Sequence, residues 1–201
     1  DMEHGPISLS NLTPLVTAAQ YGGAYAMVRV PECADHVIGA VLDIGADAVM
    51  VPQVQTAAHA RQAVAAARYA PEGYRGVNPW TRAARYGTIA DWVTVANDSA
   101  AVIALVEGAE GIANFDEIIA VPGLDAVFLG PVDMAQSMGL PGQADHPRVV
   151  AAIEAAFAKA LAAGVKVGVF ARDAAGANRW LERGATLVGI SEDTLTVQSA
   201  F

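Results

Sequence analysis

Residues 42–51, "LDIGADAVMV", join an amphipathic stretch to a short apolar run through a single glycine. The same junction recurs at 160–170, "ALAAGVKVGVF", and at 181–190, "LERGATLVGI". Glycine is common directly after a helix because it adopts the left-handed conformation without a Cβ clash. Repeated helix–glycine–strand junctions predict βα units that feed a parallel sheet.

Six short apolar runs predict strands that are buried on both faces. They lie at 24–30, 46–54, 101–107, 124–130, 165–170 and 185–190. Longer Ala-rich amphipathic stretches predict helices at 10–21, 32–44, 56–69, 81–96, 111–120, 147–163, 173–183 and 192–199. No linker or low-complexity tract divides the chain, so we expect residues 1–201 to form a single domain.

Two α/β folds accommodate this order of elements, a doubly wound sheet and a TIM (β/α)₈ barrel. A barrel normally needs about 250 residues, whereas this chain has 201. We interpret residues 1–3 as the end of a further strand. The expectation is therefore a TIM (β/α)₈ barrel whose N-terminal strand–helix unit is missing from this chain.

Composition excludes several classes of function. The net charge is −9 and the 12 Lys and Arg residues are scattered, whereas nucleic acids and anionic membrane surfaces require a clustered basic face. No window approaches 18 uncharged apolar residues, so we expect no membrane span. The single cysteine, Cys33, excludes an internal disulfide and fits a reducing compartment, which favours a cytoplasmic location.

Polar residues follow the apolar runs at the end of the sheet where α/β proteins build their active sites. They are Asp1, Glu3, His4, Arg29, Gln53, Glu107 and Asp133. Each is a residue type that can bind a metal, hold an anion or move a proton. We expect them to converge on one edge of the sheet.

Two of these carboxylates, Glu107 and Asp133, follow successive apolar runs. Together they can supply two oxygen ligands to Mg²⁺ or Mn²⁺ and leave other positions for water and a bidentate substrate. The alternatives are an exposed strand end for Glu107 and a helix N-cap for Asp133.

Arg29, His4 and the 130–133 segment each allow two interpretations. Arg29 either stabilises a developing oxyanion or forms a structural ion pair with Asp1 or Glu3. His4 is either a general base or a histidine bonded to the neighbouring acids. The backbone at 130–133 either holds a substrate carboxylate or forms a tight turn.

A polar segment at 71–87, "PEGYRGVNPWTRAARYG", carries Arg75, Arg82 and Arg85. It is too long and too polar for a simple hairpin, so we interpret it as part of the active-site edge. Contact with substrate and contact with a neighbouring subunit both remain open.

Several stretches of the chain together resemble the HpcH/HpaI family. They are "DMEHGP" (1–6), "MVRVPE" (27–32), residues 42–77, "RAARYG" (82–87), "VFLGPVDMAQSMGLPGQADHP" (127–147) and "GATLVGISEDT" (184–194). The family comprises class II, metal-dependent pyruvate aldolases, including 4-hydroxy-2-oxoheptanedioate and 2-keto-3-deoxy-sugar-acid aldolases. The resemblance runs along essentially the whole chain and implies a barrel of the phosphoenolpyruvate/pyruvate type.

The resemblance also implies roles for individual positions. Glu107 and Asp133 match the metal ligands, and the metal is Mg²⁺ or Mn²⁺, or another divalent ion such as Co²⁺, with no organic cofactor. Arg29 matches the arginine that neutralises the pyruvate enolate. His4 matches the histidine of the base machinery, Asp43 the acid that pairs with it, and Asp1 a further acid. Gly130, Pro131 and Val132 match the loop that receives the pyruvate carboxylate, with Asp133 beside it, and Gln53 lies in a segment that lines the substrate pocket.

The implied reaction is cleavage or formation of a 4-hydroxy-2-oxo acid from pyruvate and an aldehyde. Two positions depart from the family pattern: Leu105 replaces a glutamine and Val132 replaces a smaller residue. The alternatives are a CoA-ester or citramalate-type lyase on the same scaffold, and a catalytically silent barrel that acts as a binding module. Family members are usually hexamers, so a homo-oligomer such as a hexamer or trimer of dimers is expected.

Overall fold

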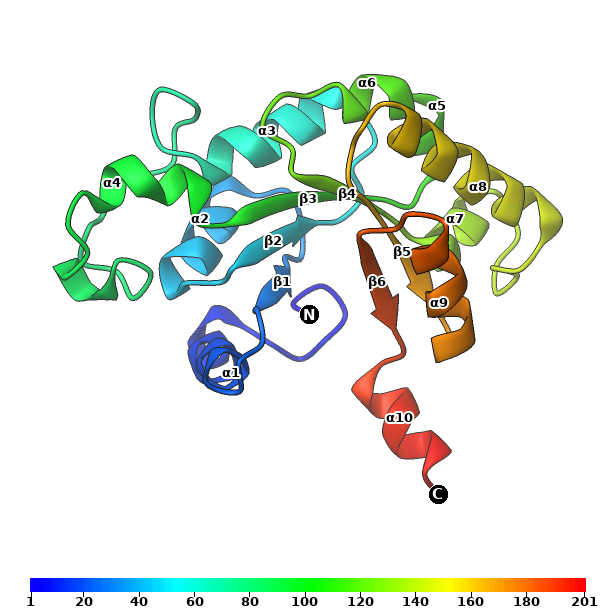
Figure 1. Cartoon of the computed structure of the whole chain (residues 1–201), viewed down its shortest axis with the longest axis horizontal. Helices are drawn as coiled ribbons and strands as arrows, with labels where there is room; N and C mark the ends of the chain where they lie inside the picture. Colours follow the sequence, from blue (N-terminus) through cyan, green and yellow to red (C-terminus); the bar gives the residue numbers. More distant parts are fainter.

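The predicted strands form one parallel sheet in the computed structural model, which describes residues 1–201. Its strands are β1 (Met27–Arg29), β2 (Ala48–Val51), β3 (Ala101–Val106), β4 (Ala126–Leu129), β5 (Val167–Ala171) and β6 (Leu187–Ile190). They pair in sequence order from β1 to β6, and β1 and β6 do not pair with each other. Figure 1 shows the sheet curled into an arch that is open on one side. The chain is thus an α/β half-barrel, consistent with part of a TIM-type barrel.

Helices connect the strands, and most of them cover the convex side of the arch, whereas the last helix projects away from the sheet (Figure 1). They are α1 (Leu9–Tyr21), α2 (Asp35–Ile44), α3 (Ala57–Ala67), α4 (Trp92–Val95), α5 (Ala109–Ala113), α6 (Phe115–Ile119), α7 (Pro131–Ser137), α8 (Pro147–Ala162), α9 (Ala174–Glu182) and α10 (Asp193–Ser199), with 3₁₀ turns η1 (Arg85–Gly87) and η2 (Ala96–Asp98). Gly45 ends α2 with φ +93°, the left-handed conformation expected at this junction. None of the helices is long and apolar enough to cross a membrane.

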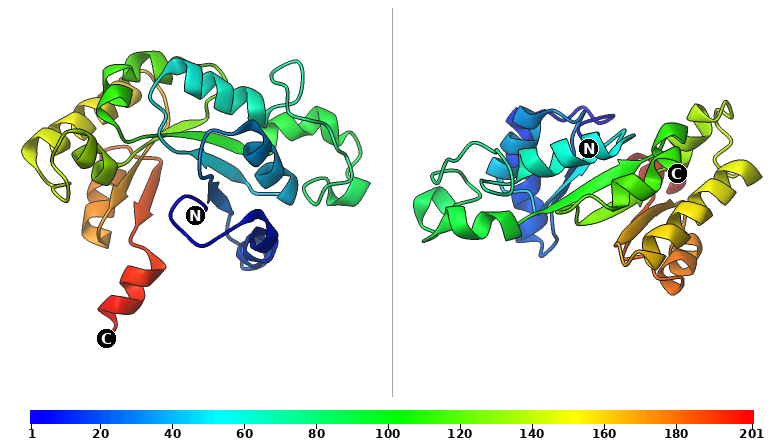
Figure 2. Two further views of the ribbon diagram at one scale, coloured as in Figure 1. Left: turned by 180° about the vertical axis from the view of Figure 1, so that it is seen from behind. Right: turned by 90° about the horizontal axis from the view of Figure 1, so that it is seen from above.

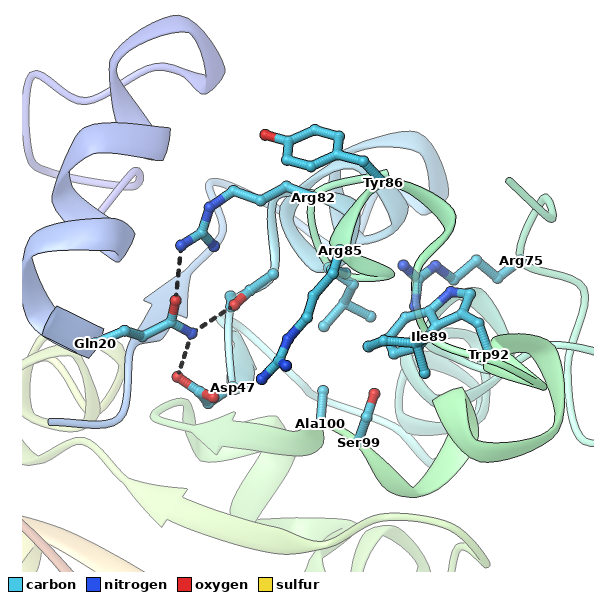
Figure 3. Close-up of a pocket in the computed structure, with 14 residues that line it drawn as sticks. Gln20, Asp47, Arg75, Arg82, Arg85, Tyr86, Ile89, Trp92, Ser99 and Ala100 are labelled. Carbon is cyan, nitrogen blue, oxygen red and sulfur yellow. Dashed lines mark hydrogen bonds between the residues drawn. The ribbon is translucent and has the colours of Figure 1, made fainter. Parts of the chain in front are cut away.

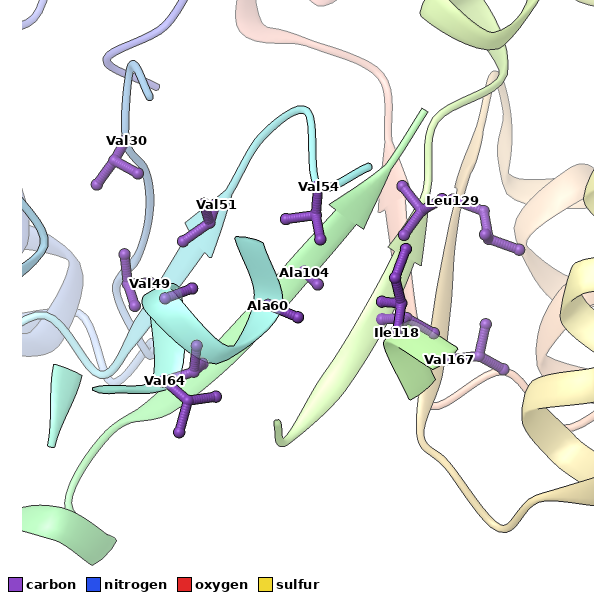
Figure 4. Packing of buried hydrophobic residues seen from close by; sticks show 14 of the residues in the cluster. Val30, Val49, Val51, Val54, Ala60, Val64, Ala104, Ile118, Leu129 and Val167 are labelled. Carbon is purple, nitrogen blue, oxygen red and sulfur yellow. The ribbon is translucent and has the colours of Figure 1, made fainter. Parts of the chain in front are cut away.

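Alternate residues along each strand face opposite sides of the sheet, and both sides are apolar. One set, including Val49, Val51, Ala104 and Leu129, packs against the helices in a cluster of 37 buried residues (Figure 4). The other set faces the hollow of the arch and forms a smaller cluster of Met50, Ile103, Leu105, Ala126 and Phe128. This division explains why the strands are continuous apolar runs, and it decides which residues enter the hollow.

The helix predicted at 81–96 is wrong. The structure has only η1 and α4 there, because Arg85, Tyr86, Gly87 and Asp91 all have positive φ, which no helix tolerates. The predicted helix at 111–120 is replaced by α5 and α6, separated at Asn114. A further helix, α7, follows β4 in a stretch expected to be a loop or turn.

Residues 1–3 lie beside the end of β1, where the expected further strand would be. Met2 donates its backbone N–H to the carbonyl of Arg29 at 2.9 Å, although residues 1–3 are not themselves a strand. Figure 2 shows this N-terminal segment close to β1 and shows α10 projecting from β6 away from the sheet. No residue of α10 is buried.

Candidate functional site

A cavity of about 510 Å³ lies in the hollow of the arch, at the C-terminal ends of the strands. We call it the rim cavity. It is lined by Asp1, His4, Met27, Arg29, Met50, Leu105, Glu107, Phe128, Gly130, Pro131, Val132, Asp133, Phe170, Leu187, Val188, Gly189 and Glu192. Eight of the ten predicted site residues are therefore gathered here, above an apolar floor of Met, Leu and Phe side chains. The two exceptions are Asp43 and Gln53.

Glu107 directly follows β3 and shares the inward-facing side of Ile103 and Leu105, so strand alternation turns its carboxylate into the hollow. The residue is only 3% exposed. Its Oε1 accepts a hydrogen bond from the backbone N–H of Gln53 at 3.0 Å. Burial raises the pKa of Glu107 to about 7; the Gln53 hydrogen bond lowers the pKa, and the nearby Asp133 charge raises it. The Gln53 hydrogen bond thus holds the carboxylate in place, although burial and the Asp133 charge disfavour its ionised form.

Asp133 comes from the next strand-to-helix connection. Gly130 precedes α7, Pro131 is its first residue, and Asp133 lies in its first turn. A Cβ on Gly130 would lie 2.9 Å from the Glu107 Cβ and 3.0 Å from its Oε2, closer than side chains tolerate. Glycine at 130 therefore lets the α7 connection approach the Glu107 carboxylate.

The donor set at Glu107 and Asp133 fits a hard divalent cation. A cation between two carboxylates would offset both the burial of Glu107 and the repulsion that raises its pKa. No cluster of three or more His, Cys, Asp or Glu side chains is arranged as a metal site anywhere in the chain. The protein would therefore supply two carboxylate ligands, with water and substrate oxygens in the other positions.

Arg29, at the end of β1, is held by the N-terminal acids. Its Nε donates to Asp1 Oδ1 at 2.9 Å and its Nη2 to Asp1 Oδ2 at 2.5 Å, a two-point contact. Glu3 Oε2 lies 3.3 Å from the same Nε. The structural ion pair considered for Arg29 is thus present, with both acids. It leaves the Nη1 donors of the guanidinium without a carboxylate partner.

His4 lies at the mouth of the rim cavity, with its side chain 65% exposed. Its Nε2 is 3.9 Å from Glu3 Oε2. That oxygen of Glu3 is buried and has no hydrogen-bond partner by the usual geometric criteria. The carboxylate nearest to the His4 ring is therefore Glu3.

The structure does not bring Asp43 to His4. Helix α2 runs antiparallel to the strands, so its last turn lies at the opposite edge of the sheet. There Asp43 pairs with Arg75, with Oδ1 2.5 Å from Nη2. Gln53 lies outside the rim cavity but lines a smaller neighbouring cavity that Glu107 and Asp133 also line, and its backbone N–H reaches Glu107.

Two further acids contribute to the site: Glu3, which was expected at this edge only as a partner for Arg29 or His4, and Glu192, which was not expected. Glu3 sits between Arg29 and His4, and Glu192 lines the rim cavity from the connection after β6. The sequence carries a signal for each. Glu3 belongs to the "DMEH" stretch, and Glu192 follows a predicted strand, as Glu107 does.

Comparison with known proteins shows which family the chain resembles. A family model described as HpcH/HpaI aldolase/citrate lyase matches residues 1–200. A 5-keto-4-deoxy-D-glucarate aldolase of Escherichia coli O139:H28 is 39% identical over 200 residues, covering 100% of this chain and 78% of the relative.

Solved structures show the same similarity. An HpcH/HpaI aldolase/citrate lyase family protein from Burkholderia cenocepacia J2315 superposes with a TM-score of 0.95 at 36% identity, covering 100% of this chain and 80% of the other. A citrate synthase, SbnG, superposes with a TM-score of 0.89 at 29% identity, covering 98% of this chain and 77% of the other.

Proposed function

The chain belongs to the HpcH/HpaI aldolase/citrate lyase family, and from this premise we propose that it is a divalent-metal-dependent aldolase. It cleaves 4-hydroxy-2-oxo acids to pyruvate and an aldehyde, or forms them in the reverse direction. The proposal rests on one observation: the buried Glu107 carboxylate beside Asp133, in a cavity shared with Arg29 and His4. The aldolase relative supports the substrate class, because 5-keto-4-deoxy-D-glucarate counted from its other carboxyl end is a 4-hydroxy-2-oxo acid.

Glu107 and Asp133 hold the cation in this proposal, and the hydrogen bond from the Gln53 amide keeps Glu107 oriented toward it. When bound, a divalent cation such as Mg²⁺ or Mn²⁺ would polarise the keto and carboxylate oxygens of the 2-oxo acid, which stabilises the enolate in cleavage and makes the methyl protons of pyruvate more acidic in the reverse direction. The cavity floor of Met50, Leu105 and Phe128 keeps water from the apolar side of the substrate.

Arg29 stabilises the enolate oxygen that develops during the reaction. A fixed planar cation suits this task because it needs no reorganisation when the charge appears. Asp1 and Glu3 hold the guanidinium through its Nε and Nη2 atoms and leave Nη1 free to donate. The backbone N–H groups of Val132 and Asp133, in the unpaired first turn of α7, are suited to receive the substrate carboxylate.

His4 moves the proton in this proposal. In cleavage, its imidazole takes the proton of the hydroxyl on carbon 4, the bond between carbons 3 and 4 breaks, and the aldehyde leaves. The electron pair remains on carbon 3 as the pyruvate enolate, which then takes up a proton to give pyruvate. Glu3 Oε2 lies 3.9 Å from the imidazole Nε2 and helps to orient the ring.

A second candidate is carbon–carbon bond formation of the citrate synthase or CoA-ester lyase type. The similarity to the citrate synthase structure favours it. So does Leu105, which gives the rim cavity an apolar wall where the aldolase pattern has glutamine. Oxaloacetate with an acyl donor is the substrate pair that discriminates this candidate from the aldolase.

The test is pyruvate release from a 4-hydroxy-2-oxo acid, measured with and without EDTA. We expect activity to require added Mg²⁺ or Mn²⁺ and to fall at least ~100-fold in Glu107→Gln. Glu117→Gln is the matched control, because Glu117 is exposed on α6, away from the rim cavity. Activity that survives EDTA, or that Glu107→Gln leaves unchanged, contradicts the proposal. The absence of turnover with every substrate would favour the silent binding module.

A further inference from the structure

A second large cavity, of about 580 Å³, lies at the opposite edge of the sheet from the rim cavity. We call it the arginine cavity (Figure 3). It is lined by Gln20, Leu42, Gly45, Ala46, Asp47, Arg75, Arg82, Ala83, Arg85, Tyr86, Ile89, Trp92, Ser99 and Ala100. The 75–92 segment covers residues that lead into β2 and β3, so the expectation that it belongs to the active-site edge is wrong.

The lining of this cavity is cationic in an acidic protein. It holds three of the ten arginines and one carboxylate, that of Asp47, while the chain as a whole carries −9. Asp47 already accepts hydrogen bonds from Gln20 and from the Ala26 amide. Asp43, just outside the lining, pairs with Arg75, so the three arginines face two carboxylates and the cavity keeps a surplus of one positive charge.

Two of the arginines are fixed in place by the fold. Arg75 is buried, pairs with Asp43 and stacks on the ring of Tyr69 at 4.8 Å. Arg82 donates to the Ile44 carbonyl at 2.8 Å and to Gln20 Oε1 at 3.0 Å. Both side chains thus form a rigid, preorganised wall.

The third arginine has no partner. No carboxylate lies within 4 Å of the Arg85 guanidinium, and its side chain makes no hydrogen bond within the chain. Arg85 is exposed, and Figure 3 shows its side chain lying along the cavity with its guanidinium toward Asp47 and Ala100. Its backbone has φ +47°, a conformation that costs energy in a residue with a side chain.

Buried donors in the lining are also unsatisfied. Neither Arg75 Nε nor Trp92 Nε1 has a hydrogen-bond partner, although both atoms are buried. Both groups are N–H donors with no acceptor capacity. Both atoms are enclosed by the protein, so the donor that is open to an anionic oxygen in the cavity is the exposed Arg85 guanidinium.

We propose that the arginine cavity is a binding site for a small oxyanion, a carboxylate or phosphate of metabolite size. Its volume lies in the range of small-molecule sites, about 300–1,000 Å³. The lining contains no His, Cys or Lys that could act as base or nucleophile. We therefore assign the site binding only, separate from the rim cavity.

The experiment titrates the full chain with inorganic phosphate and, separately, with malonate, in EDTA, with sodium chloride as the ionic-strength control. Trp92 is the reporter, with Trp80 and Trp180 replaced by Phe. We expect at least one anion to quench the Trp92 fluorescence saturably, with a dissociation constant below about 10 mM. Arg85→Gln should lower the affinity for the anion about tenfold, because a charge-assisted hydrogen bond is lost. The partnerless Arg85 makes this substitution safe for folding, and Arg61→Gln, at an exposed arginine of α3, is the matched control.

Three outcomes overturn the proposal. The first is no saturable response to either anion. The second is binding that Arg29→Gln removes and Arg85→Gln leaves intact, which would place the anion in the rim cavity. The third is a concentration-dependent dimer, seen by sedimentation, that Arg85→Gln dissociates, because the cavity would then accept a carboxylate of a second copy. The relative responses to phosphate and malonate identify which oxyanion the site prefers.

Discussion

The rim cavity and the arginine cavity are similar in volume, about 510 and 580 Å³, but opposite in charge. Four carboxylates and one arginine line the first, and one carboxylate and three arginines line the second. The difference follows from position in the fold. Residues after the strands enter the hollow at one edge, whereas helix ends and loops before the strands meet at the other. We therefore propose cation and substrate chemistry at the first edge and anion binding at the second.

Arg29 is the one cation in the acidic cavity, so its replacement should have the largest effect after the loss of Glu107. Lysine keeps the charge but cannot donate to Asp1 through two nitrogens and also to an oxyanion. We expect Arg29→Lys to lower kcat about 100-fold with a smaller change in KM, as for loss of one oxyanion donor. Arg61→Lys is the control. A change confined to KM would show that Arg29 only binds substrate.

Gly130→Ala tests whether the close approach of α7 to Glu107 builds the cation site. The new methyl group would press on the Glu107 carboxylate, and we expect metal affinity to fall about 10–100-fold, as for other disturbed metal ligands. Calorimetric titration with Mn²⁺ measures this. Gly76→Ala is the control, since a Cβ at Gly76 meets nothing within 4 Å. Equal affinities in the two variants would contradict the role of Gly130.

The raised pKa of Glu107, about 7, predicts a pH dependence of metal binding. Because the cation binds the carboxylate form, affinity should fall toward tenfold per pH unit below about pH 7. Calorimetry from pH 8 to pH 5.5 checks this, and Glu107→Gln should flatten the dependence. A flat profile in the unmodified chain would contradict it.

Stability of the metal-free chain should follow the opposite pH trend. The folded state holds the Glu107 proton more tightly than the unfolded chain, so this group's contribution is fully present below pH 4.5 and is lost as pH rises toward 7. The loss is on the order of 2 kcal/mol. Urea unfolding of the metal-free chain and of Glu107→Gln over pH 4.5–7.5 measures the difference. Indistinguishable pH profiles would show that Glu107 does not cause it.

The smallest effect concerns independence of the two cavities. Because they lie at opposite edges of the sheet, Arg85→Gln should change metal-dependent turnover less than about twofold. Pyruvate release at saturating metal measures this, with Arg61→Gln beside it. A larger loss would show that the arginine cavity acts on the reaction and is more than a separate binding site.

The strands and most of the rim cavity were predictable because their signals are local. The apolar runs located all six strands, and the residue that ends each run found Arg29, Glu107 and Asp133. Strand alternation adds the direction: Glu107 has the same parity as Leu105 and so points into the hollow. Their chemical roles remain predictions for the experiments above.

The errors arose where contacts between distant segments decide the structure. The 81–96 stretch has helical periodicity, but the hydrogen bonds of Arg82 and Ala83 with the end of α2 hold it as a loop. Asp43 lies in the last turn of α2, and the direction of that helix places Asp43 at the other edge of the sheet, away from His4. No local pattern reports either fact, because both depend on how α2 packs against the sheet.

The sequence by itself determined the alternation of strand and helix, the parallel sheet, and the acidic side chains at its C-terminal edge. These follow from hydrophobic periodicity and from glycines at helix ends, which act within a few residues. Tertiary structure alone decided the partners of Arg75 and Arg82 and the existence of the cavity that they line with Arg85. It also selected Glu3 as the acid beside His4, since charge pairing depends on distances that only the folded chain sets.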